Sequence, residues 1–151
     1  MLGDLGISFR IVVPSIPETI RPGEAPADYA QRMARAKAEE IRVRAAREES
    51  GNGQVAVILA ADTIVVRGRT LLGKPGGPDE AAAMIESLSG AVHRVITGLS
   101  ILETERGAVT QERNAIVATN VEFRDLSPDE IQRYARGSEP LDKAGAYGIQ
   151  G

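Results

Sequence analysis

Asp62 and Lys74 are the two residues whose surroundings first suggest chemistry. An apolar run from Val55 to Ala61 leads directly into Asp62, and a turn at residues 67–69 brings the chain back toward Lys74. Because a buried unpaired carboxylate is costly, we expect Asp62 where a strand ends or bends, with Lys74 close to it. An acid and an ammonium at strand ends favour a site for metal and phosphate. A structural ion pair at the base of a hairpin explains the same two residues equally well.

Glu18 and Lys37 are two further charged residues in unusual positions. Glu18 lies in residues 14–27, a loop stiffened by four prolines, where a glutamate is ordinarily solvated. Lys37 falls on the apolar stripe of a predicted helix, four residues from both Met33 and Ile41. Its long side chain either reaches the surface along that stripe or points inward toward an anion.

His93 is the only histidine, and the sequence has no cysteine. Disulfides, thiol catalysis and histidine- or cysteine-rich metal sites are therefore excluded. A lone histidine near the start of a strand is more often structural than catalytic. Any metal in this chain must be held by carboxylates, which favours Mg²⁺ or Mn²⁺.

The composition is that of a soluble globular domain. The chain has 151 residues, of which 42% are hydrophobic and 3% aromatic, so we expect one domain with a core of Ala, Val, Ile and Leu. The net charge of −3 argues against a nucleic-acid partner but permits a small anionic substrate. Neither a bilayer-spanning apolar run nor a signal peptide is recognised, so we expect a cytoplasmic protein with no membrane association.

Helical and strand periods alternate along the chain, which indicates an α/β fold. The last predicted helix begins with Ser127-Pro128-Asp129-Glu130, the pattern of a capping box. Its end is expected at about Arg136. Residues 115–123 alternate in a way that predicts a half-buried strand, and the small residues of 142–151 allow close backbone approach. The other predicted elements are strands at 9–13 and 92–102, a central hairpin with apolar runs at 55–61 and 64–66, helices at 26–49 and 79–88, and turns at 50–53 and 104–107. The spacing predicts an inward stripe of Ala30, Met33, Ala34 and Ile41 for the first helix and a buried side of Ala83, Met84 and Leu88 for the second.

Five short motifs occur in one order and together resemble a known family. They are Ala-Asp-Thr-Ile-Val-Val from residue 61, Leu-Gly-Lys-Pro from 72, Leu-Ser-Gly with His-Arg-Val-Ile-Thr-Gly from 88, Phe-Arg-Asp-Leu from 123, and Asp-Lys-Ala-Gly-Ala-Tyr-Gly-Ile-Gln-Gly from 142. The chain closely resembles the Maf-type nucleoside triphosphate pyrophosphatases, also called septum-formation-inhibitor-like proteins, over nearly all 151 residues. The last motif is the most specific of the five.

The resemblance implies both a fold and an activity. The fold would be α/β, with a mixed, strongly curved sheet and flanking helices, similar to the inosine triphosphate pyrophosphatases. The activity would be metal-dependent hydrolysis of a nucleoside triphosphate to the monophosphate and pyrophosphate. Members commonly form homodimers and act in the cytoplasm, where they are thought to remove non-standard nucleotides.

The resemblance also implies roles for individual residues of this sequence. Asp62 would be the catalytic proton acceptor and a metal contact, and Glu18 would help to hold the metal, although the family more often has Asp before that glutamate. Lys37 and Lys74 would face the triphosphate. Thr63 and Gln150 correspond to positions associated with base choice in the branch that prefers dTTP and UTP.

Two departures from the family pattern bear on activity. The family opens with a strand and a Ser-x-Ser-Pro-Arg-Arg loop, and it continues with a strand and a helix beyond the residue that matches Gly151. We therefore expect residues 1–151 to form a single Maf-like domain that lacks these segments, including an arginine that contacts phosphate. The alternatives are a truncated remnant that binds nucleotides with little or no turnover, and a cell-division regulator that acts through protein partners.

Overall fold

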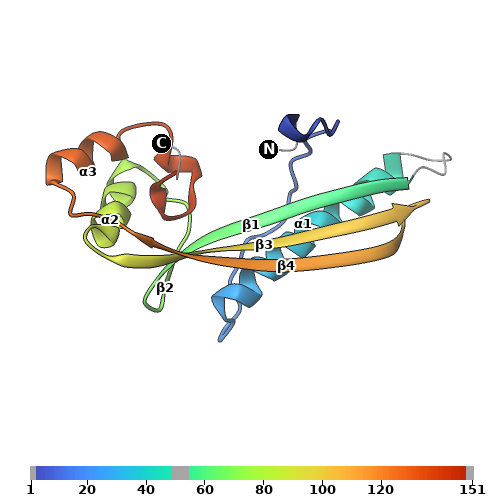
Figure 1. Ribbon diagram of the computed structural model, residues 1–151, viewed down its shortest axis with the longest axis horizontal. Helices are drawn as coiled ribbons and strands as arrows, with labels where there is room; N and C mark the ends of the chain where they lie inside the picture. Colours follow the sequence, from blue (N-terminus) through green and yellow to red (C-terminus); the bar gives the residue numbers. More distant parts are fainter. Residues whose placement is uncertain (1–2, 49–54, 149–151) are drawn as a thin grey trace.

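The computed structural model describes residues 3–48 and 55–148, and it shows a long sheet with a helical lobe at one end (Figure 1). The α/β class predicted from the sequence is confirmed. The helices are α1 (Pro26–Glu48), α2 (Pro78–Leu88) and α3 (Pro128–Ala135), with short 3₁₀ turns η1 (Gly3–Leu5), η2 (Pro140–Asp142) and η3 (Ala144–Ala146). The strands are β1 (Val55–Arg67), β2 (Thr70–Leu72), β3 (Val92–Glu105) and β4 (Ala108–Glu122).

The four strands form one sheet in the order β2-β1-β3-β4. Each neighbouring pair of the described strands is antiparallel, and Asp62 of β1 lies opposite Gly98 of β3. The three long strands twist as they run from the α1 end toward the helical lobe (Figure 1). The sheet is therefore a long platform that carries the central part of β1 beneath α1.

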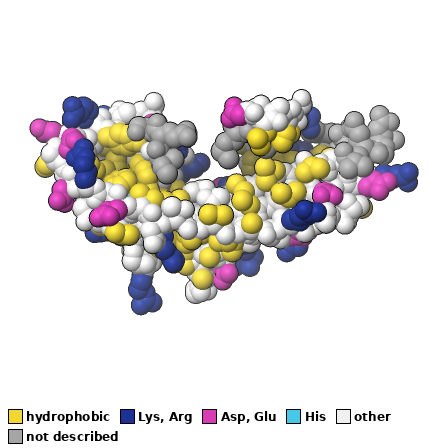
Figure 2. Space-filling view, viewed as in Figure 1, with side chains coloured by type: hydrophobic (Ala, Val, Ile, Leu, Met, Phe, Trp, Pro, Cys, Tyr) yellow, Lys and Arg dark blue, Asp and Glu magenta, His cyan; other side chains and the backbone are white. Residues whose placement is uncertain are grey.

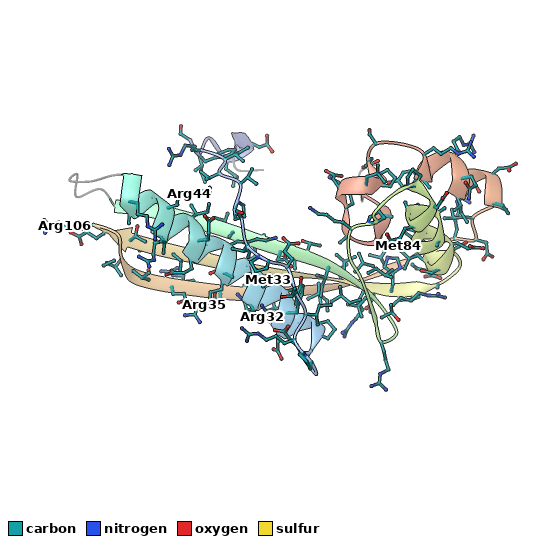
Figure 3. All side chains as sticks on the ribbon, turned by 180° about the vertical axis from the view of Figure 1, so that it is seen from behind. Arg32, Met33, Arg35, Arg44, Met84 and Arg106 are labelled. Atoms are coloured by element: carbon teal, nitrogen blue, oxygen red, sulfur yellow. The ribbon has the colours of Figure 1, made fainter. Side chains whose placement is uncertain are left out.

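Helix α1 covers one face of β1 and β3. Tyr29, Ala30 and Met33 pack against Ile64 and Ile96 to form the core of this part of the molecule. Figure 3 shows α1 lying along the sheet with Met33 in its N-terminal half, whereas Met84 lies in the separate helical lobe. The inward stripe predicted for this helix is confirmed at its first three positions, because Ala30, Met33 and Ala34 are buried.

The helical lobe has a core of its own. Ala81 and Ile85 of α2 pack with Ile131 and Ala135 of α3 and with Ala146 of η3. The predicted start of α3 is confirmed: Ser127 and Glu130 form a complete capping box.

Of the buried side predicted for α2, Leu88 is confirmed and Ala83 is wrong. Ala83 is exposed rather than buried. The helix instead buries Ala81, Ala82, Ile85 and Leu88, a stripe whose direction is set by the position of α3.

The strand predicted at residues 9–13 is wrong, because this segment has no regular structure. A strand requires the backbone groups of a neighbour, and none of the described strands pairs with it. Ile11 and Val13 are consequently exposed. The turn predicted at 50–53 lies outside the described residues.

The half-buried pattern predicted for residues 115–123 is also wrong. These residues belong to β4, which begins at Ala108 and forms the edge of the sheet beyond the cover of α1. Nearly all its side chains are exposed, including that of Val117. The hairpin is longer than predicted because pairing with β3 extends the strand through the polar residues 110–114.

Away from the helical lobe, the face of the sheet opposite α1 is open. Figure 2 shows apolar side chains distributed over this side of the long strands, and Val57, Leu59 and Val117 are exposed apolar residues on it. Within the described parts of the chain, no helix is both long and apolar enough to cross a membrane.

Gly98 is the point at which α1 comes closest to the sheet. A Cβ atom at this position would lie 2.7 Å from the backbone nitrogen of Gln31, and nearer still to the carbonyl of Ala30. No real side chain tolerates such contacts with helix backbone. Since Gly98 lies opposite Asp62, the same close approach brings α1 to the level of Asp62.

We expect Gly98→Ala to lower the free energy of unfolding by about 2 kcal/mol or more, because the new methyl group must push α1 off the sheet. Chemical denaturation measures the loss. Gly77→Ala is the matched control: its Cβ would meet nothing within 4 Å, so its effect should stay within about 0.5 kcal/mol. Equal effects of the two substitutions would contradict this account of α1 packing.

Candidate active site

The ammonium of Lys37 lies between two carboxylates. Lys37 Nζ is 2.6 Å from Asp62 Oδ1 and 2.7 Å from Glu18 Oε1. The three residues come from α1, from β1 and from the loop before α1. The side chains of Lys37 and Asp62 are only 17% and 9% exposed, whereas Glu18 is half exposed. The inward orientation of Lys37 is therefore confirmed.

Asp62 does not lie where the sequence predicted. Strand β1 runs without interruption from Val55 to Arg67, so Asp62 is in its middle rather than at an end or a bend. Its partner is Lys37, which reaches across from the helix, and not Lys74 as expected from the hairpin. The expectation was wrong because a second element supplies the compensating charge that makes a buried carboxylate tolerable within a strand.

Burial and charge act against each other at this site. Burial raises the pKa of Asp62 above the ordinary aspartate value, and the hydrogen bond from Lys37 opposes this only in part. Burial also works to lower the pKa of Lys37, but its bonds to Asp62 and Glu18 outweigh burial and raise that pKa. Lys37 therefore stays charged, while Asp62 becomes a better proton acceptor than an exposed aspartate.

The loop that carries Glu18 is anchored to α1 by Arg32. The guanidinium donates to the Thr19 carbonyl at 2.9 Å and to Glu24 Oε1 at 2.5 Å. The hydrogen bond from Arg32 lowers the pKa of Glu24 to about 2, so this anchor is charged throughout the physiological range. Figure 3 shows Arg32 near the N-terminal end of α1, beside the loop. Glu18 is therefore held in an ion pair rather than free in a solvated loop.

Thr63 lies on the other face of the sheet. Successive side chains of a strand point to opposite sides, so Thr63 points away from Lys37 and Asp62. Its Oγ1 is 2.9 Å from Oγ1 of Thr97, the residue opposite it on β3. The structure thus places two adjacent predicted site residues on opposite faces of one strand.

Lys74 lies outside the hydrogen-bonded cluster. It is exposed, just after β2, and its charge is one of those that lower the pKa of Asp62. The preceding residue, Gly73, accepts a backbone hydrogen bond from Gly145 at 2.9 Å, so the C-terminal tail contacts the segment that carries Lys74. Gln150 lies outside the described residues.

Tyr29 is a residue of this site that the sequence analysis missed. It is buried, and its pKa is raised first by burial and then by the charges of Asp62 and Glu18. Tyr29, Met33 and Lys37 follow one another at intervals of four, so the helical stripe that pointed to Lys37 could also have found Tyr29. No sequence pattern could have identified Arg32, because its role depends on how the irregular loop before α1 folds.

The carboxylates suit a divalent cation that is bound together with phosphate. Among the described residues, no group of three or more His, Cys, Asp or Glu side chains could hold a metal. Mg²⁺, however, commonly takes only one or two protein carboxylates and completes its shell with water and substrate phosphates. Asp62 and Glu18 already flank a positive charge, that of Lys37, so this pair of residues fits such an ion.

The model of the Maf-like protein family matches residues 1–151. This chain belongs to the Maf family. Three similar proteins, each named dTTP/UTP pyrophosphatase, come from Hahella chejuensis, Myxococcus xanthus and Cupriavidus metallidurans. The first two are 46% and 44% identical to the chain over 151 residues, and the third is 41% identical over 157. In each case the match takes in 100% of this chain and 70%, 70% and 74% of the relative, respectively.

We expect Lys37→Met to lower the free energy of unfolding by about 3 kcal/mol at pH 7, because it leaves the buried Asp62 carboxylate without its partner. Without Lys37, the folded-state pKa of Asp62 rises further above its unfolded value. Protonation as the pH falls then favours the folded state, so the loss should be smaller at pH 5 than at pH 7. Urea denaturation at the two pH values measures it.

The control for this substitution is Lys143→Met, which removes an exposed lysine paired with Asp142. Its effect should be within about 0.5 kcal/mol at both pH values. A loss for Lys37→Met that did not change with pH would show that Asp62 is not the group left unpaired.

Proposed function

We propose that this protein is a nucleoside triphosphate pyrophosphatase that hydrolyses dTTP and UTP to the monophosphate and pyrophosphate. The observation that carries the proposal is the buried ammonium of Lys37 between Asp62 and Glu18. This arrangement supports a site in which Asp62 accepts a proton, Lys37 binds phosphate and the carboxylate oxygens bind a metal ion. Membership of the Maf family and the names of the relatives support the same activity.

Asp62 is the proposed proton acceptor. Its pKa, raised by burial, suits a group that orients an attacking water and takes its proton. The water attacks the α-phosphorus, the bond to the bridging oxygen breaks, and pyrophosphate leaves. Tyr29 and the apolar side of α1 limit the access of bulk water to the acceptor.

Lys37 and Lys74 are the proposed ligands of the triphosphate. In the structure Lys37 is neutralised by two carboxylates, and a bound phosphate oxygen offers the same ammonium a further partner. An ammonium is a point charge that stabilises the negative charge developing on the leaving pyrophosphate without a fixed bidentate geometry. Lys74 is exposed just after β2, whose last residue pairs with Val65 of β1, and it adds a second positive charge from another element.

Asp62 and Glu18 are the proposed ligands of a divalent cation, Mg²⁺ or Mn²⁺. When bound, such a cation neutralises negative charge on the phosphates. The chain's own contribution is to hold both carboxylates in place, Glu18 through the Arg32 anchor and Asp62 through the register of β1.

Thr63 and Gln150 are the proposed residues for base choice. Thr63 shares its face of the sheet with Val65, and Val65 lies directly against Gly145 in the tail. The tail therefore runs along the side of β1 to which Thr63 points, and Gln150 follows Gly145 by five residues. The contact of Gly145 with this side of β1 supports a site for the base that is formed by Thr63 and the tail.

The proposed protein acts in the cytoplasm, where nucleoside triphosphates are abundant, and forms a homodimer. Its open sheet face bears exposed apolar side chains, which suits a contact between subunits. The net charge of −3 favours a small nucleotide over a nucleic acid as its partner.

We expect the chain to release pyrophosphate from dTTP and UTP with Mn²⁺ or Mg²⁺, and Asp62→Asn to lower kcat at least about 100-fold, because the proton acceptor is lost. Removal of the metal with a chelator should abolish release, and added metal should restore it. A coupled pyrophosphate assay measures all of these rates.

Asp79→Asn is the control, because Asp79 is an exposed carboxylate in the first turn of α2. It should leave kcat unchanged. Equal rates for the wild type and Asp62→Asn would refute the assignment. Nucleotide binding without any product would instead favour the remnant that binds nucleotides without turnover.

A further inference from the structure

His93, Phe123 and Tyr147 form a cluster of three rings at the junction of the sheet and the helical lobe. The centroid of the His93 ring lies 5.0 Å from that of the Phe123 ring and 5.5 Å from that of the Tyr147 ring. The centroids of the Phe123 and Tyr147 rings are 4.8 Å apart. All three contacts are edge-to-face, the favoured geometry for such rings. His93 is only 2% exposed, and its Nε2 is 2.7 Å from the Tyr147 hydroxyl oxygen.

This cluster helps to hold residues 144–148, the part of the C-terminal tail that the structure describes. Tyr147 directly follows η3, and two further contacts hold the same short segment: Gly145 donates to the Gly73 carbonyl, and Gly148 donates to the Tyr134 hydroxyl at 3.2 Å. Gly145 also has φ +71° and lies so close to Val65 that a Cβ atom would be 2.8 Å from Val65 Cγ2. The path of residues 144–148 is therefore closely specified.

The tail in turn contacts the segment that carries Lys74. The Gly73 carbonyl that accepts from Gly145 belongs to the residue immediately before Lys74. The first rigid group after Gly145 in the tail is the Tyr147 ring, which the His93 hydrogen bond holds in one orientation. A hydrogen bond is directional, unlike apolar packing alone, so it fixes the position of the hydroxyl end of this ring and restrains the backbone attached to it.

We propose that His93 and Tyr147 are positioning residues for the triphosphate: their hydrogen bond holds the tail, and the tail's bond to Gly73 holds Lys74 where it meets phosphate. This inference rests on the proposed function in one respect, the role of Lys74 as a phosphate ligand. It gives the single buried histidine a function in substrate binding without contact with the substrate.

The test is a double-mutant cycle in the affinity for a non-hydrolysable analogue of dTTP, measured with Mg²⁺ by calorimetry on the whole chain. The four proteins are the wild type, Tyr147→Phe, Lys74→Met and the variant with both changes. Tyr147→Phe keeps the ring but removes the hydroxyl, and it should weaken binding about fivefold. In the Lys74→Met background the same change should have almost no effect, because the residue that it positions is gone.

Thr104→Val is the control for a general loss of stability. It removes another buried hydroxyl, one that donates to the Ala56 carbonyl at 3.3 Å, close to the other end of the sheet. It should leave the affinity unchanged. The inference is overturned if Tyr147→Phe weakens binding equally with and without Lys74, if Thr104→Val weakens binding as much, or if the wild type does not bind the analogue.

The inference and the proposed function can fail separately. Pyrophosphate release by the wild type and Asp62→Asn tests only the reaction, whereas the binding cycle requires no turnover. An active enzyme whose affinity is indifferent to Tyr147→Phe would refute the positioning role and leave the proposed function standing. If the effects of Tyr147→Phe and Lys74→Met on affinity are coupled but the wild type releases no pyrophosphate, the positioning role stands and the proposed function is refuted.

Discussion

The site depends on one positive charge that is shared by two negative ones. Lys37 neutralises Asp62 and Glu18 only in part, so the group of three ionised side chains carries a net charge of −1 in partly buried surroundings. Such a group is stable in the folded protein, yet it retains an attraction for further positive charge. Under the proposed function, a nucleotide that arrives with a divalent cation would bring both that charge and new acceptors for the lysine. The resting ion pairs would then prepare the site for its substrate without closing it.

The approach of α1 to the sheet makes this arrangement possible. Lys37 reaches Asp62 because Gly98, opposite Asp62, has no side chain to hold the helix away. Arg32, on the same helix, ties down the loop before it and so brings Glu18 to the other side of the ammonium. One helix thus sets the contacts of both carboxylates: it meets Asp62 through its packing on the sheet, and it holds Glu18 through the hydrogen bonds of Arg32.

The sequence predicted the features that depend on local pattern. The three helices and the capping box at Ser127 follow from spacing along one element. Spacing also placed Lys37 on the apolar stripe of its helix but left two directions open to its side chain, of which the structure shows the inward one. The position of Asp62 within β1 could not be predicted in the same way, because the charge that makes it tolerable comes from another element. The predictions for residues 9–13 and for the burial of β4 were wrong for a related reason. An apolar or alternating pattern indicates a strand, but only the neighbouring strands and helices decide whether that strand is paired and covered. The roles of Arg32 and Gly98 likewise exist only in three dimensions.

The alternation of β1 has a consequence for how the protein can change. Asp62 and Thr63 point to opposite sides, and their register is fixed by Gly98 and Thr97 on β3. A substitution at Thr63 alters one face and leaves the ion pairs of the other intact. Deletion of a single residue within β1 would instead turn the carboxylate toward the open face and place a different side chain beside Lys37. Strand β1 can therefore accept substitutions on its open face, whereas insertion or deletion of one residue within it would remove the site altogether.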